Sequence, residues 1–200
     1  MELYQASDNL SGPICKAHEW IQEAQQSQVA LPHAMNVSTI NFEGKPTSRM
    51  VLLKRIAQEG FVFFTDYEGN KGKQIIKTPN VALNFWWAKT NKQIRIEGKC
   101  SKVSEAENDE YFSSRPRGSQ ISASVSFQSK ELKSYESLLE RSKVFEEDHA
   151  NKDIVRPDRW GGFIVEPEII EFWIDQKNRL HKRELYKLEE SKWNLYLLSP

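Results

Sequence analysis

Short strand-like segments recur along most of this chain, and their regular recurrence limits the folds that it can adopt. The segments that read as strands are residues 35–42, 47–56, 61–65, 81–87, 92–103, 160–174, 179–188 and 192–198. Within 92–103, Ile94 and Ile96 alternate with polar residues, as in a strand with one buried face. Helical segments are inserted between groups of strands and do not alternate with them one for one. The sequence therefore predicts an α+β fold with a β-barrel-like core.

Helical spacing marks the remaining ordered segments. Residues 13–28 place apolar side chains on one face, and 131–148 read as an exposed amphipathic helix. Residues 71–77 predict a short helix. Ser104 stands three residues before Glu107, which is typical of a capping box at the start of a helix over 104–114. Residues 151–159 read as a loop.

Composition excludes several classes of protein. The 28 Lys and Arg balance the 28 Asp and Glu, so a chain-wide basic surface for nucleic acid is not expected. No apolar run approaches the roughly 20 residues of a membrane helix, and the N-terminus lacks the pattern of a signal peptide. We therefore expect a cytoplasmic protein that binds neither membrane nor nucleic acid. We expect one domain over residues 1–200, with a flexible segment at 1–12.

The cysteines and histidines give no sign of a metal centre. Cys15 and Cys100 are too few for a disulfide framework, and no ligand pair has the spacing of a zinc site. The chain also lacks a GxGxxG segment, a P-loop and a GxSxG turn. These absences argue against the common nucleotide folds and against a serine hydrolase, and we expect no metal.

Cations concentrate in three separate stretches. In 48–54 (SRMVLLK), Arg49 and Lys54 fall on opposite faces if the strand is continuous; they read either as solvated edge charges or as anion anchors. Residues 111–120 (YFSSRPRGSQ) read either as a loop that ends a helix or as a phosphate pocket made of side chains. In 179–183 (RLHKR), alternate residues on one strand face would carry too much positive charge to be buried without an anion; an exposed basic strand is the alternative.

Taken together, these stretches resemble the pyridoxamine 5'-phosphate oxidase family, which uses flavin mononucleotide (FMN). The resemblance runs from about residue 10 to residue 200. It rests on SRMVLLK (48–54), FFT (63–65), NKGKQI (70–75), KQIRIEGK (92–99), YFSSRPRGSQI (111–121), SFQS (126–129), WGGF (160–163), EFW (171–173) and RLHKR (179–183). It implies a split β-barrel with peripheral helices. It also implies a homodimer that binds FMN at the subunit interface.

The resemblance carries roles to particular residues. FMN would contact Arg49, Met50, Val51, Leu52, Leu53, Lys54, Phe64, Thr65, Asn70, Lys71, Gln93, Gln128, Ser129, Trp173 and Arg183. The substrate's phosphate would contact Lys54, Tyr111, Arg115 and Ser119. Arg179 and His181 would bind the pyridine ring and act as the catalytic pair.

The activity that the resemblance implies is oxidation of pyridoxamine and pyridoxine 5'-phosphates to pyridoxal 5'-phosphate, with O2 as the electron acceptor. The chain departs from the family pattern in three places. Asn70 stands where the family has Arg, Lys182 where it has Asp, and the segment before the first helix is short, with Tyr4 read as its remnant.

Two other functions remain open. One is a related flavin oxidase that acts on phenazine precursors, although such enzymes tend to lack the Lys of VLLK and the Arg-Pro-Arg loop. The other is a non-catalytic protein that binds flavin or pyridoxal phosphate. The first would share the predicted fold.

Overall fold

The computed structural model describes residues 3–150 and 152–200. Its strands are β1 (Gln5–Ala6), β2 (Ala34–Ile40), β3 (Pro46–Leu52), β4 (Arg55–Ala57), β5 (Gly60–Asp66), β6 (Asn80–Trp87), β7 (Lys92–Lys102), β8 (Trp160–Ile174), β9 (Lys182–Glu189) and β10 (Lys192–Leu198). Its helices are α1 (Gly12–Gln26), α2 (Asn70–Lys77), α3 (Glu105–Ser114), α4 (Arg117–Val125) and α5 (Tyr135–Asp148), with a 3-10 turn η1 (Lys177–Arg179). No helix in this described part is long and apolar enough to cross a membrane.

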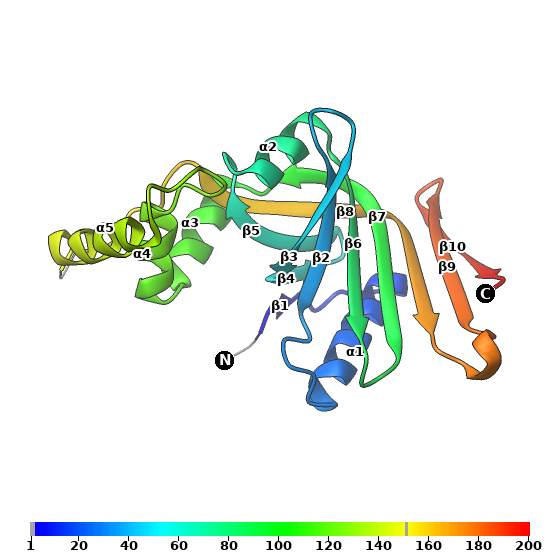
Figure 1. The fold of residues 1–200 in the computed structure, drawn as a ribbon. Helices are drawn as coiled ribbons and strands as arrows, with labels where there is room; N and C mark the ends of the chain where they lie inside the picture. Colours follow the sequence, from blue (N-terminus) through cyan, green and yellow to red (C-terminus); the bar gives the residue numbers. More distant parts are fainter. Residues whose placement is uncertain (1–2, 151) are drawn as a thin grey trace.

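All the strands belong to one sheet that curls on itself. The main path runs β1-β4-β5-β8-β7-β6-β2-β3, and β9 and β10 extend from β8 (Figure 1). Strands β3 and β4 follow each other in the chain, yet they stand near opposite ends of this path. The connection between them is so short that it spans at most about 11 Å. The sheet must therefore curl until its ends meet, which confirms the expected α+β split β-barrel.

The chain crosses the seam of the barrel at Leu53 and Lys54. The backbone N–H of Leu53 donates to the carbonyl of His33, the residue before β2, at 2.9 Å. The next N–H, that of Lys54, donates to the carbonyl of Val62 in β5 at 2.8 Å. Consecutive residues thus bond to the two sides of the seam. Leu53 is fully buried, whereas the Lys54 side chain is half-buried.

Helices cover the barrel unevenly. The apolar face of α1, including Ile14, Ala17 and Ile21, is fully buried against the barrel core. Figure 1 shows α3, α4 and α5 gathered at one end of the molecule, whereas β9 and β10 lie at the opposite end. A second apolar cluster, which includes Phe112, Ile121 and Trp160, joins α3 and α4 to the start of β8. The end that carries the helices therefore combines segments that are separated in the sequence.

The structure corrects several boundaries. The strand expected over 47–56 is broken at the seam into β3 and β4. The 111–120 stretch, whose residues favoured a loop, contains the end of α3 and the start of α4. The strand expected from residue 179 begins only at Lys182, so Arg179 and His181 lie in a turn and do not share a strand face with Arg183.

Part of the N-terminal segment contacts the barrel. Residues Gln5–Ala6 pair in parallel with β4. Tyr4 is buried, and its hydroxyl lies 2.7 Å from Nδ1 of His18 in α1. Of the expected flexible segment 1–12, residues 1–2 lie outside the described residues, and Tyr4 contributes to the core.

The WGGF segment at the start of β8 needs both of its glycines. The Tyr67 hydroxyl donates to the carbonyl of Gly162 at 3.0 Å, and the N–H of Gly162 donates to Asn108 Oδ1 at 2.7 Å. A Cβ on Gly161 would lie 2.2 Å from the Tyr67 hydroxyl oxygen, and one on Gly162 would lie 2.8 Å from the Phe64 ring. These contacts hold the end of β5, helix α3 and the start of β8 in fixed positions relative to one another.

We expect Gly161→Ala to destabilise the protein by about 2 kcal/mol, because the added methyl overpacks a buried contact. Gly118 in α4 is the matched control, since a Cβ there meets nothing within 4 Å. Gly118→Ala should leave stability unchanged or raise it slightly through helix propensity. Chemical denaturation of both variants measures the difference. Equal stabilities would contradict the packing role of Gly161.

Candidate active site

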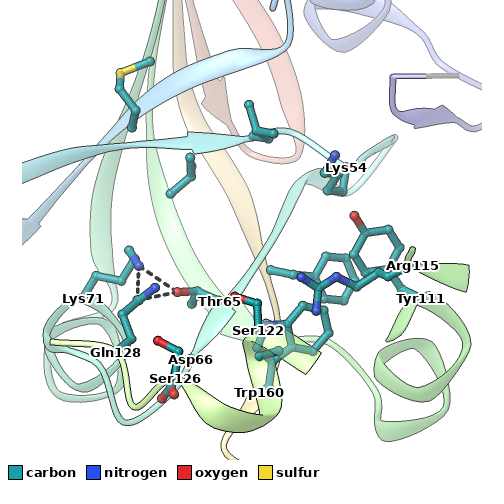
Figure 2. A pocket seen from close by; sticks show the side chains of 15 residues that line it. Lys54, Thr65, Asp66, Lys71, Tyr111, Arg115, Ser122, Ser126, Gln128 and Trp160 are labelled. Carbon is teal, nitrogen blue, oxygen red and sulfur yellow. Dashed lines mark hydrogen bonds between the residues drawn. The ribbon is translucent and has the colours of Figure 1, made fainter. Parts of the chain in front are cut away.

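A cavity of about 320 Å³ opens at the seam of the barrel (Figure 2). Its walls come from β3, β5, α2, α3, α4 and the start of β8. The lining residues that the sequence predicted are Met50, Val51, Leu52, Lys54, Phe64, Thr65, Lys71, Tyr111, Arg115 and Gln128. The structure therefore brings residues from two of the three cationic stretches to one place.

One end of the cavity is built around Lys71, in the first turn of α2. Its Nζ donates to Thr65 Oγ1 at 2.7 Å and also to Gln128 Oε1. Burial, followed by the charge of Arg49, lowers the pKa of Lys71 to about 8. The ammonium thus lacks the solvation and countercharge that would hold its proton firmly, and an anion bound here would supply that charge.

The other end of the cavity is aromatic and carries Arg115. The ring of Phe64 stacks on that of Tyr111 with centroids 4.0 Å apart, and on Trp160 at 5.4 Å. The Arg115 guanidinium lies over the Trp160 ring, 4.4 Å from its centroid. Its Nη1 is buried without a hydrogen-bond partner among the described residues. A buried, unpaired N–H donor is costly, so this end is suited to an anionic ligand.

Lys54 connects this aromatic end to the seam. Burial lowers its pKa, and the nearby positive charge of Arg115 adds to that effect. Figure 2 shows Lys54, Arg115 and Tyr111 together on one side of the cavity, and Lys71, Thr65 and Gln128 on the other. The cavity thus has two separate cationic ends, each able to bind a phosphate group.

Arg49 lies outside the cavity lining, in a polar network with α2. Its Nη1 donates to Thr39 Oγ1 at 2.6 Å, and its Nη2 donates to Thr47 Oγ1 at 2.9 Å and to Gln74 Oε1 at 3.2 Å. Thr39 also donates to Gln74 Oε1 at 2.6 Å. The buried Gln74 amide oxygen therefore holds the Arg49 guanidinium in place next to α2.

The third cationic stretch lies at the opposite end of the molecule. Trp173, Arg179 and His181 line a different depression, where β8 ends and η1 follows. In Figure 1 this turn lies at the far side from α3 and α4. Within one described chain, Arg179 and His181 therefore do not reach the seam cavity.

Arg183 belongs to this end as well, and a buried carboxylate holds it. Glu171 on β8 accepts from Arg183 Nε at 2.6 Å and from Arg95 Nη1 at 2.8 Å. Glu171 is only 4% exposed. A buried carboxylate between two arginines fixes both guanidinium groups, and Glu97 also pairs with Arg95 at 3.6 Å.

The remaining predicted residues lie around these two sites. Leu53 is in the core. Gln93 donates to Asn84 at 2.8 Å, and the N–H of Asn70 donates to Ser129 Oγ at 3.2 Å. Ser119 does not line the cavity, but Ser122, one turn further along α4, does.

Comparison with known protein families shows which family this chain belongs to. Residues 21–143 match the family model described as pyridoxamine 5'-phosphate oxidase. Residues 160–200 match the model described as the pyridoxine 5'-phosphate oxidase C-terminal dimerisation region. The chain belongs to the pyridoxamine 5'-phosphate oxidase family. The expectation of an oxidase of this family is confirmed.

Full-length relatives carry the same family name. The chain is 44% identical to pyridoxine/pyridoxamine 5'-phosphate oxidase from Haemophilus influenzae, over 94% of the chain and 89% of the relative. It is 43% identical to the protein of that name from Psychromonas ingrahamii, over 98% and 90%. It is 42% identical to that from Cyanothece sp., over 94% and 88%.

Solved structures share the oxidase fold. PhzG from Burkholderia lata, solved with tetrahydrophenazine-1-carboxylic acid, matches with a TM-score of 0.90 at 29% identity, over 96% of this chain and 95% of that one. An FMN-binding protein from Nostoc punctiforme, related to pyridoxamine 5'-phosphate oxidase, matches with a TM-score of 0.77 at 15% identity, over 95% and 99%. The second likeness shows the fold alone.

Sequence reasoning assigned no role to several residues of the oxidase cavity. Trp160, Ser122, Ser126 and Asp66 also line it. Trp160 is part of the WGGF marker, so its position was available as a signal. Ser126 likewise begins the SFQS marker, whereas Ser122 lies in α4, a helix that the sequence did not predict.

We expect the Lys71 end to bind sulfate, a dianion whose charge is constant between pH 7 and 9.5. Because Lys71 is charged below its pKa of about 8 and neutral above it, the affinity should fall several-fold over this range. Calorimetric titration at constant ionic strength measures the change. Lys71→Gln should remove most of the pH dependence, whereas Lys73→Gln, on the exposed side of α2, should keep it. A pH dependence that survives Lys71→Gln would contradict the assignment.

Proposed function

We propose that this protein oxidises pyridoxamine and pyridoxine 5'-phosphates to pyridoxal 5'-phosphate, with FMN as its cofactor and O2 as the electron acceptor. The main support is the seam cavity, where Lys71 at one end and Lys54 with Arg115 at the other match two phosphorylated ligands side by side. The unpartnered Nη1 of Arg115 favours a ligand with an anionic group.

The Lys71 end fits the FMN phosphate. Lys71, Thr65 and Gln128 already contact one another there, and Arg49 lies close enough to affect the Lys71 pKa. Met50, Val51 and Leu52 of β3 form an adjacent wall for the rest of the cofactor. A bound flavin supplies the two-electron chemistry that amino-acid side chains lack. The chain's part is to bind, to orient and to exclude water.

The aromatic end fits the phosphate of the B6 substrate. Lys54 and Arg115 would pair with it, and the Tyr111 hydroxyl would add a hydrogen bond. Holding the substrate here fixes the reacting carbon relative to the cofactor, and such positioning accounts for several kcal/mol of the barrier. For the amine substrate, O2 and water are consumed, and ammonia and hydrogen peroxide are released. For the alcohol, O2 alone is consumed and hydrogen peroxide is released.

We propose that the active site is completed by a second copy of the chain. Arg179, His181 and Arg183 lie far from the seam cavity of their own chain, within the region 160–200 that matches the dimerisation model. In a two-fold dimer, each cavity can receive these residues from the partner. The two halves of the site would then meet twice per dimer.

Oxidation of a phenazine precursor is the second candidate, and the likeness to PhzG supports it. Lys54 and Arg115 favour a phosphorylated substrate instead. We expect the purified protein to be yellow and to consume O2 with pyridoxamine 5'-phosphate, and at least about a hundredfold more slowly with unphosphorylated pyridoxamine at equal concentration. An oxygen electrode measures both rates. Equal rates, or a colourless protein that FMN does not reactivate, would contradict the proposal. A yellow protein without turnover would favour a carrier.

Mixing two inactive variants tests the shared site. Arg115→Ala removes a residue of the cavity, and Arg179→Ala removes one supplied by the partner. After subunit exchange, each mixed dimer has one site with both changes and one intact site, so activity should recover to about a quarter of the wild-type value. Mixing Arg115→Ala with Lys54→Ala is the control, since both changes affect the same half and no intact site forms. Recovery in the control alone, or in neither mixture, would contradict the two-chain site.

A further inference from the structure

The turn that presents Arg179 and His181 is closed by contacts of the imidazole. The Nδ1 atom of His181 lies 3.0 Å from the Asp175 carboxylate and 3.3 Å from the backbone nitrogen of Gln176. The ring also packs against Trp173, with centroids 4.5 Å apart. Among the described residues, Nε2 of His181 has no hydrogen-bond partner.

We propose that Asp175 is a positioning residue that holds His181 as the Nδ1–H tautomer, with Nε2 left as the nitrogen that meets a ligand. This inference rests on the proposed function for the role of His181 in the reaction, but the tautomer itself is a property of the protein alone. Neither the family matches nor the relatives' names assign a role to Asp175.

The two neighbours of Nδ1 require opposite protonation states of this nitrogen. The Gln176 N–H can donate only to an Nδ1 that carries no proton, whereas the Asp175 carboxylate can only accept a proton from Nδ1. The carboxylate contact is the shorter one and involves a full charge, which attracts a proton on Nδ1 and repels a bare Nδ1 lone pair. Asp175 therefore decides the tautomer.

The local backbone supports a defined geometry for this pair. β8 ends at Ile174, and the chain turns back through Asn178 and Arg179, whose φ angles of 57° and 61° are in the left-handed region. The Asp175–His181 contact joins the two sides of this turn and leaves Arg179 exposed near its tip. Non-glycine residues hold such angles when surrounding contacts fix them, often at functional sites.

The cation that follows His181 in the chain does not compete for Asp175. Lys182, which departs from the family pattern, pairs instead with Glu184 at 2.6 Å. Glu184 in turn contacts Lys16 of α1. The Asp175 carboxylate therefore keeps its charge available for the imidazole.

A neutral His181 held in this way presents an acceptor lone pair at Nε2. Both proposed B6 substrates carry an N–H or O–H proton at the group that is oxidised, and an acceptor nitrogen can orient such a donor. The reversed tautomer would present an N–H there, which cannot accept that bond. Loss of Asp175 should therefore reduce turnover without removing the cofactor.

Nitrogen NMR of the apo-protein tests the tautomer directly. In protein with ¹⁵N-labelled histidine at about pH 8.5, where an ordinary imidazole is neutral, we expect the His181 signals of an Nδ1–H ring. A His181→Gln sample assigns the signals. Asp175→Asn should shift them toward the Nε2–H form, because the new amide can donate to Nδ1 together with Gln176. Asp175→Glu and the exposed control Asp153→Asn should keep the wild-type pattern. An Nε2–H wild-type ring, or an unchanged pattern in Asp175→Asn, would overturn the inference.

Kinetics test the consequence for the reaction. We expect Asp175→Asn to lower kcat for pyridoxamine 5'-phosphate about tenfold, with FMN affinity, measured by fluorescence titration, unchanged within about twofold. Asp175→Glu should recover most of the loss. Full activity in a variant whose tautomer has reversed would overturn the positioning role. A wild-type protein without oxidase activity would refute the proposed function, and the NMR result would still decide the tautomer assignment.

Discussion

The short connection between β3 and β4 is the constraint on which the rest of this structure depends. Strands near opposite ends of one sheet are joined through Leu53 and Lys54 alone, so the sheet has to close into a barrel with a seam at that point. Leu53 packs into the core, and Lys54 is carried to the edge of a cavity that β5, α2, α3 and α4 complete. The same backbone feature that closes the fold thus places a cation in the site.

Positive charge in this protein is concentrated where it is poorly compensated, although the chain as a whole is neutral. Burial lowers the pKa values of Lys54, Lys71 and Arg115, which shows that these groups lack the solvation and countercharges that stabilise a cation. Several arginines elsewhere pair with carboxylates, as Arg183 does with Glu171. Burying unpaired cations costs free energy while the cavity is empty. A bound anion relieves this cost, which strengthens anion binding. Phosphorylated ligands therefore suit this family member's seam cavity.

The sequence was sufficient for most strands, because alternation of apolar and polar residues is a local signal. It was not sufficient for the break after Leu52, since the apolar pattern continues through Leu53 and the break depends on pairing with β2 and β5. The helix α4 was missed because Pro116 and Gly118 favour a loop locally, whereas Arg159 stabilises the helix by donating to its carbonyl groups at Ala123 and Ser124. The site residues were named through the family resemblance. Neither the sequence pattern nor the resemblance showed that they separate, within one chain, into a seam cavity and a distant turn.

The dependence of FMN affinity on protein concentration tests the central claim most directly, because a site shared between two chains must bind its cofactor more tightly in the dimer. Sedimentation velocity with absorbance detection at the flavin band follows bound FMN and subunit association together. We predict that FMN sediments with the dimer, that added FMN shifts a dilute sample toward the dimer, and that FMN affinity falls as the protein dissociates. Monomers that bind FMN as tightly as the dimer would contradict the account.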